Sequence, residues 1–138
     1  MAIEALGRVF NVVPTADAVE VNLRDVGAVT FVCVGADTYT VQESTDASGT
    51  SAQDLDVVDH YYTCTSAAGA AAWVRATQTA DAAVTIGSGV AVIEVDSNSL
   101  SDGFDFIECT SSAAGLVVAI THDLSVQRAP QNLPAAAV

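Results

Sequence analysis

The stretch Val19-Glu20-Val21-Asn22-Leu23 alternates apolar and polar side chains at every position. The same period of two returns in residues 39–42, 93–96 and 104–106. Successive side chains of a β-strand point to opposite faces of its sheet, so this period predicts strands with one buried and one solvated face. The pattern therefore indicates an all-β protein.

Turn signals separate the alternating stretches. Clusters of Gly with Ser, Asp or Ala occupy residues 46–49, 67–69, 87–89 and 101–103. Short strands at this spacing predict a single small antiparallel β-sandwich or barrel-like domain. Two similar segments, residues 64–69 and 109–115, are each expected to form the turn of a β-hairpin. Residues 51–59 resemble a helix start, with Ser51 and Asp54 at capping-box spacing, and predict one or two helical turns.

The two ends of the chain differ from its middle. Pro14 closes the first segment, and Pro130 and Pro134 interrupt the last ten residues. Each proline removes a backbone donor and favours extended backbone before it. We therefore expect an N-terminal arm over residues 1–16, a β-sandwich domain over residues 17–128 and a C-terminal extended tail over residues 129–138. Either arm could reach a neighbour or fray.

The charge of the chain is strongly negative. Its 138 residues carry 17 acidic side chains against four arginines and no lysine, for a net charge of −13. Phosphate binding requires clustered basic residues, so nucleic acids and anionic membranes are not expected partners. The charge is consistent with solubility and also with binding to a basic partner. No signal peptide or membrane-spanning run is recognisable, and we expect synthesis in a cytoplasm.

The core is expected to consist of many small side chains around a few large ones, with Trp73, Phe31 and Phe104 as anchors. Three cysteines, Cys33, Cys64 and Cys109, form no C-x-x-C pair. Their odd number argues against a disulfide framework, and their apolar surroundings predict buried free thiols.

Catalytic chemistry finds little support in the sequence. His60 and His122 each adjoin an aspartate, but adjacent strand residues point to opposite faces, so neither pair is expected to form a dyad. A metal site built from both histidines and nearby acids remains an alternative, as does calcium binding by paired carboxylates such as Asp54 and Asp56. No nucleophile elbow, P-loop or zinc-protease motif occurs. We expect no enzyme, no cofactor and no metal.

The C-terminal third carries a family resemblance. Residues 102–108, the turn to Gly115 and residues 117–135 resemble the close of head decoration (minor capsid) proteins of tailed actinobacteriophages. The segment 59–63, with Trp73 after the following turn, is similar too. The resemblance covers about two thirds of the chain and lies in packing and turn patterns.

Membership of that family would imply a structural virion protein on the outer surface of a phage head. It would bind the major capsid protein, stabilise contacts between capsid subunits and form a homo-oligomer, commonly a trimer. We expect the terminal arms to make these contacts. The candidate contact residues are the apolar and basic side chains near the two ends: Ile3, Leu6, Arg8, Val9, Phe10, Arg128 and Leu133.

Two other functions remain open. A tail-tube or other tail subunit is possible, although tube subunits need long hairpins and no long uninterrupted strand pair is evident. A carbohydrate-binding β-sandwich could use Tyr61, Tyr62 or Trp73, of which the two adjacent tyrosines should face opposite sides of the sheet.

Overall fold

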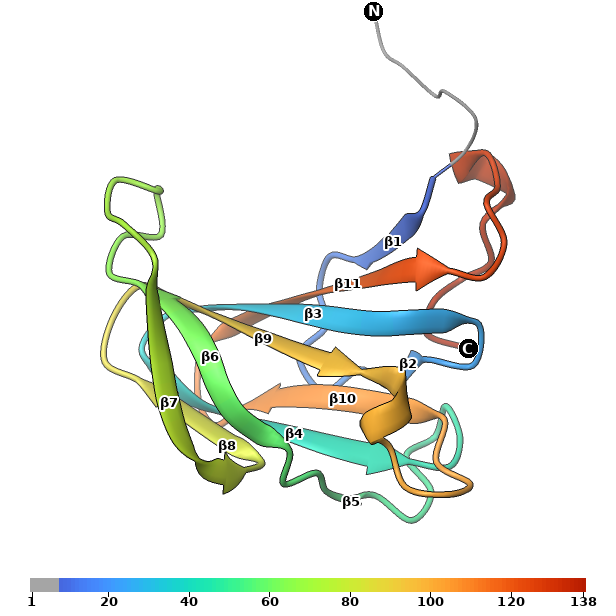
Figure 1. Cartoon of the computed structure of the whole chain (residues 1–138), viewed down its shortest axis with the longest axis horizontal. Helices are drawn as coiled ribbons and strands as arrows, with labels where there is room; N and C mark the ends of the chain where they lie inside the picture. The colour runs from blue at the N-terminus through green and yellow to red at the C-terminus, as the bar shows by residue number, and fades with distance from the viewer. Residues whose placement is uncertain (1–7) are drawn as a thin grey trace, which may run out of the picture.

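Two antiparallel sheets pack face to face in the computed structural model, which describes residues 8–138 (Figure 1). The predicted all-β sandwich is confirmed. The larger sheet contains, in spatial order, β1 (Phe10–Val13), β11 (Leu116–Leu124), β3 (Val26–Val34), β9 (Val90–Asp96), β6 (Val58–Cys64) and β7 (Val74–Asp81). The smaller sheet contains β2 (Val21–Asn22), β10 (Phe106–Ser111), β4 (Asp37–Ser44) and β5 (Gln53–Asp54), and β8 (Ala83–Ile86) also pairs with β4. Two short 3-10 turns, η1 (Ser97–Ser99) and η2 (Pro130–Asn132), complete the described chain.

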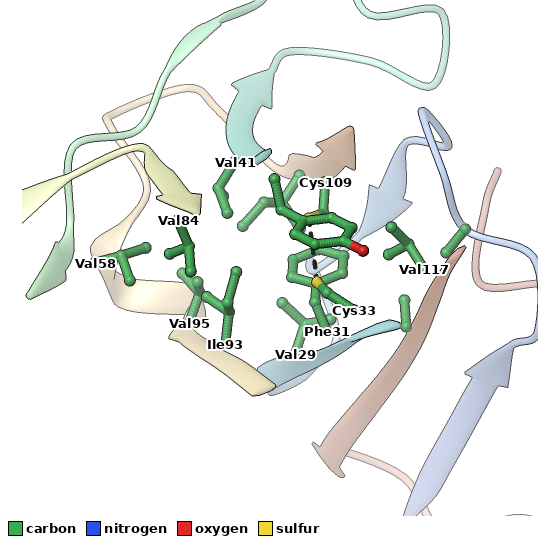
Figure 2. Close-up of a cluster of buried hydrophobic side chains, with 14 of the residues drawn as sticks. Val29, Phe31, Cys33, Val41, Val58, Val84, Ile93, Val95, Cys109 and Val117 are labelled. Carbon is green, nitrogen blue, oxygen red and sulfur yellow. Dashed lines mark hydrogen bonds between the residues drawn. The ribbon is translucent and has the colours of Figure 1, made fainter. Parts of the chain in front are cut away.

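The inner faces of the two sheets form one apolar core (Figure 2). Alternate residues of β3, Val29, Phe31 and Cys33, have no exposed surface, and they meet Tyr39 and Val41 of β4. This confirms the period of two as the signal of buried strand faces and confirms Phe31 as an anchor. Phe104 is half-buried and precedes β10. The three cysteines are buried and free, as predicted.

The turn from β10 to β11 is one of the connections at which the chain crosses between the sheets, and Asp37 holds that turn. One carboxylate oxygen of Asp37 accepts the Ser112 backbone and hydroxyl donors, and the other accepts the backbone N–H of Ala113 at 3.0 Å and of Gly115 at 2.9 Å. The hydrogen bond from Ser112 contributes most to lowering the pKa of Asp37 to about 2. An ionised side chain on β4 thus organises the loop that leads into the other sheet.

The two similar segments of the sequence have different structures. Residues 64–69 lie in the connection between β6 and β7, which pair as a hairpin, as predicted. The prediction is wrong for residues 109–115, because β10 belongs to the smaller sheet and β11 to the larger one. The contacts to Asp37 explain the difference, since they direct the second turn across the sandwich.

A second buried carboxylate holds the opposite end of β4. Glu43 accepts hydrogen bonds from the Ser101 hydroxyl and the Gln53 side-chain amide, both at 2.6 Å, and from the Ser101 backbone at 2.8 Å. Burial alone would raise the pKa of Glu43, but these hydrogen bonds outweigh it and lower the pKa below its ordinary value. Asp37 and Glu43 therefore fasten loops at both ends of the same strand.

The segment 51–59 contains no helix, so that prediction is wrong. Ser51 has a left-handed φ of 58°, and β5 pairs with β4, where Gln42 donates to Asp54 at 2.6 Å. The pairing of β5 at the sheet edge thus uses the residues that a helix would need.

The predicted glycine turns are present. In the turn before β9, Gly89 has a φ of +74°, and a Cβ at this position would collide with the carbonyl oxygen of Cys64.

Both terminal segments contact the domain (Figure 1). Residues 10–13, placed by the sequence in the N-terminal arm, form the edge strand β1 and pair with β11. The C-terminal segment closes the gap between the edges of the two sheets. Asn11 of β1 donates to the carbonyl of Pro134 at 2.9 Å, and the backbone N–H of Asn22 in β2 donates to Ala136 at 2.8 Å.

Replacing Asp37 with asparagine should lower the Tm at pH 7 by several degrees, because the β10–β11 turn loses its charged acceptor. The folded pKa is depressed, so the stabilisation is complete above the ordinary value of 3.8 and is lost as pH falls from 3.8 toward 2. The difference in Tm between the wild type and Asp37→Asn should therefore shrink over that range. Thermal unfolding followed by circular dichroism measures it, with Asp102→Asn on an exposed turn as control. A difference independent of pH would contradict the assignment.

Candidate functional site

The outer surfaces of the two sheets differ in chemistry. On the larger sheet, the half-buried side chains of Val118, Val32 and Val92 lie side by side across three neighbouring strands. On the smaller sheet, the corresponding outward pair is Thr110 beside Thr40. The solvent side of an antiparallel sheet is ordinarily polar, so the apolar surface of the larger sheet is the unusual one.

The apolar face is defined here as the outward hydrophobic side chains of the larger sheet: Phe10, Val12, Val32, Val34, Tyr62, Val92, Leu116, Val118 and Ile120. Leu116 is 66% exposed and Phe10 is 40% exposed, and the other members are half-buried. Thr30, Glu94 and His122 lie on the same outer side, so the apolar side chains are most closely grouped in the row Val118, Val32 and Val92. Grouped apolar side chains on a protein surface make it a candidate interaction site. Covering a half-buried valine would contribute about 1 kcal/mol of hydrophobic stabilisation.

The residues before β1 and those after β11 meet beside this face. The backbone N–H of Arg8 donates to the carbonyl of Arg128 at 2.8 Å, and Phe10 of β1 pairs with His122 of β11. Val9 and Val126 are about half exposed at the same corner. We call Arg8, Val9, Phe10, Val126 and Arg128 the terminal corner. Four of the seven candidate contact residues are thereby brought together at one end of the larger sheet.

The terminal corner carries positive charge on an acidic protein. Among residues 8–138, the ion pair that involves an arginine is Arg24 with Asp105, at 3.0 Å. The Arg8 guanidinium lies 5.0 Å from the centre of the Phe10 ring, a cation–π contact that leaves its N–H donors available. Arg128 is exposed. The corner therefore offers cationic donors next to apolar side chains.

Of the remaining candidate residues, Leu133 adjoins the terminal corner. Leu133 is half-buried and lines a cavity of about 290 Å³ beneath the C-terminal segment, together with Arg128 and Asn22. The structure thus places Leu133 against its own domain. Ile3 and Leu6 lie outside the described residues.

Trp73 is not a core anchor, so that prediction is wrong. Its side chain is 54% exposed, next to Val74 at 60%. Trp73 directly precedes the edge strand β7, which has a neighbour on one side only, so no second layer covers it. The two tyrosines do face opposite sides, as predicted. Tyr61 packs against the core. Tyr62 lies on the outer side, where its ring contacts the His60 ring edge to face, with 6.0 Å between the two ring centres.

Each histidine contacts the aspartate beside it, which strand alternation by itself does not predict. His60 hydrogen-bonds Asp59 at 2.6 Å, and His122 hydrogen-bonds Asp123 at 3.1 Å. Strict alternation fails at both places, because the register of β6 with β7 shifts before His60 and because Asp123 has a left-handed φ of 57°. Each aspartate can therefore reach the ring of its neighbour.

His122 also links two strands of the larger sheet. Its Nε2 lies 3.0 Å from the hydroxyl of Thr30, so Thr30, His122 and Asp123 form a chain of hydroxyl, imidazole and carboxylate. Acyl transfer additionally needs backbone donors for an oxyanion. Thr30 lies in the middle of β3, which is paired with β11 on one side and β9 on the other, so the neighbouring N–H groups are engaged. We interpret the hydrogen-bonded series Thr30, His122 and Asp123 as a polar link between β3 and β11.

Metal binding finds no geometric support within residues 8–138, where no cluster of three or more His, Cys, Asp or Glu side chains could hold an ion. His60 and His122 lie on β6 and β11, with β3 and β9 between them.

Glu20 and Glu108 line a shallow hollow, and burial is the main cause that raises the pKa of each. No helix in the described part of the chain is long and apolar enough to cross a membrane.

Comparisons with protein-family models, with curated proteins and with solved structures found no match to this chain. The apolar face and the terminal corner are therefore interpreted from their own chemistry.

Proposed function

We propose that this chain is a structural virion protein, a capsid decoration protein that binds the outer surface of a phage head. Its apolar face and terminal corner would contact the major capsid protein and stabilise the contacts between capsid subunits. The observation that carries the proposal is the difference between the two outer sheet faces, where the row Val118, Val32 and Val92 on one stands against the pair Thr110 and Thr40 on the other.

A one-sided domain suits a subunit that covers a surface. Its apolar face would be buried on the shell, and its polar sheet would face solvent. The net charge of −13 keeps unassembled copies apart in solution. Arg8 and Arg128 beside the apolar face would pair with carboxylates of the shell, which gives the contact its orientation.

Decoration acts by mass action. A subunit that binds the assembled shell but not its dissociated parts stabilises the assembled state, and the stabilisation grows with the concentration of free subunit. This mechanism requires neither catalysis nor a cofactor. The resemblance of residues 102–135 to head decoration proteins of actinobacteriophages supports the same assignment and suggests a homo-oligomer, with a trimer as the first expectation.

The first test compares one residue pair on each outer face. Val32→Thr/Val92→Thr should weaken binding to expanded capsid shells about tenfold or more, because two hydroxyl groups would be desolvated in the contact. Both valines lie side by side, and threonine keeps the β-branched shape that favours a strand. Co-sedimentation of purified protein with shells that lack decoration measures the affinity.

The matched control is Thr40→Val/Thr110→Val, the reverse exchange in a cross-strand pair on the opposite sheet. Its binding should stay within about twofold of wild type, since each change alters only one methyl or hydroxyl group outside the contact. Circular dichroism verifies that both variants fold. Equal binding by the two double variants would contradict a contact through the apolar face.

The second test concerns charge at the terminal corner. Arg8→Glu should weaken shell binding roughly threefold at low salt, and the loss should diminish as salt screens the interaction. Arg75→Glu makes the same charge change on β7, at the far edge of the larger sheet, and should have the smaller effect. Equal losses for both variants would show that net charge alone controls binding.

Removing residues 1–7 tests Ile3 and Leu6 by the same measurement of shell binding.

Carbohydrate binding is a second candidate, favoured by the exposure of Trp73 and by the outward Tyr62 ring. Exposed aromatic rings stack on sugar rings, but the apolar face offers few polar groups to orient a sugar. A glycan array on which wild type binds and Trp73→Ala does not would favour this function over the capsid contact.

A further inference from the structure

Cys33 and Cys109 face each other across the core. Cys33 lies on β3 of the larger sheet and Cys109 on β10 of the smaller sheet, 76 residues apart in sequence. Their sulfur atoms are 3.8 Å apart, and neither residue has exposed surface. Figure 2 shows the two cysteine side chains pointing toward each other, with a dashed line marking their contact beside Phe31.

We infer that Cys33 and Cys109 are a site of oxidative cross-linking, at which a disulfide joins the two sheets of the sandwich. The inference does not depend on the proposed function. The two sulfurs are already in van der Waals contact, and a disulfide requires about 2.05 Å between them. The sulfurs must therefore approach by less than about 2 Å, a movement that side-chain rotation and a small shift of the sheets can share.

The oxidant is a small-molecule disulfide such as oxidised glutathione. One cysteine, as thiolate, attacks a sulfur of the small molecule, forms a mixed disulfide and releases one small thiolate. The second cysteine then attacks the protein sulfur of the mixed disulfide and releases the other small thiolate. The two protein thiols lose two electrons and two protons, which the two released thiols carry.

The reaction belongs to the opened or folding chain. The hydrogen bond with Cys33, and then burial, raise the pKa of the Cys109 thiol far above its usual range. The folded Cys109 thiol therefore supplies almost no thiolate near neutral pH, and the packed core excludes the oxidant. The same burial protects the finished bond from reductants, so the conditions during folding determine which form persists.

Cys64 provides an internal control. It is also buried, but it lies at the end of β6, where its sulfur is 3.2 Å from the carbonyl of Ser66 and 3.4 Å from that of Ala71. These contacts hold the Cys64 thiol in the β6–β7 connection, whereas Cys33 and Cys109 contact each other.

The test refolds the full chain from denaturant, once with oxidised and reduced glutathione and once with reductant alone. Alkylation under denaturing conditions, followed by mass spectrometry, counts the free thiols. Refolding with glutathione should leave one alkylated thiol in wild type and none in Cys64→Ala. Cys33→Ala and Cys109→Ala should each keep two. The oxidised wild type should have a Tm higher by roughly 5 to 15 °C than the reduced form, as expected for a cross-link that closes a long loop.

Three alkylated thiols in wild type after oxidative refolding would overturn the inference. So would a bond that is lost in Cys64→Ala, or a cross-linked form with a lower Tm than the reduced protein. The reduced variants are first compared with reduced wild type by circular dichroism. Cys64→Ala alone tests the Cys33–Cys109 bond if either of the other two variants fails to fold.

Discussion

The last crossing of the chain, from the smaller sheet to the larger one after β10, depends on the carboxylate of Asp37. It accepts hydrogen bonds from Ser112, Ala113 and Gly115, so the turn after β10 leads out of the smaller sheet. Strand β11 can then pair with β3 on one side and with β1 on the other. The contact between Arg8 and Arg128, which flank the paired strands β1 and β11, follows from this pairing. An anion suits the task, because its two oxygens can accept several converging N–H and O–H donors at once.

The two inner faces of the sandwich are alike in chemistry, whereas the two outer faces differ. Both inner faces are apolar because they bury each other, and that requirement constrains every second residue of β3, β4, β9 and β10. No such requirement acts on the outer faces, yet Val32 and Val92 occupy one and Thr40 and Thr110 the other. Since an apolar outer face gives the isolated domain little stability and adds a risk of aggregation, a partner surface is the physical explanation that we favour.

Local rules of strand geometry fail at the places where the structure is most distinctive. Asp59 and Asp123 reach the rings of their neighbouring histidines because a register shift and a left-handed φ interrupt alternation there. Trp73 is exposed because it precedes an edge strand. In each case the residues around the side chain show an ordinary strand pattern. The environment of the side chain is set by strands that are distant along the chain. Composition and period therefore cannot predict these contacts.

The sequence by itself determined the all-β class, the glycine turns, the buried free cysteines and the acidic surface, because each depends on composition or on spacing within a few residues. Only the tertiary structure decided which strands share a sheet. It distinguished the turn at residues 109–115 from the hairpin at residues 64–69, and it joined Arg8, Phe10 and Arg128 into one corner. It also brought Cys33 and Cys109 to 3.8 Å. The physical reason is that strand order and sheet packing are long-range properties. They are fixed by hydrogen bonds and burial between segments that lie far apart in the sequence, and no local sequence pattern shows which of these segments will pair.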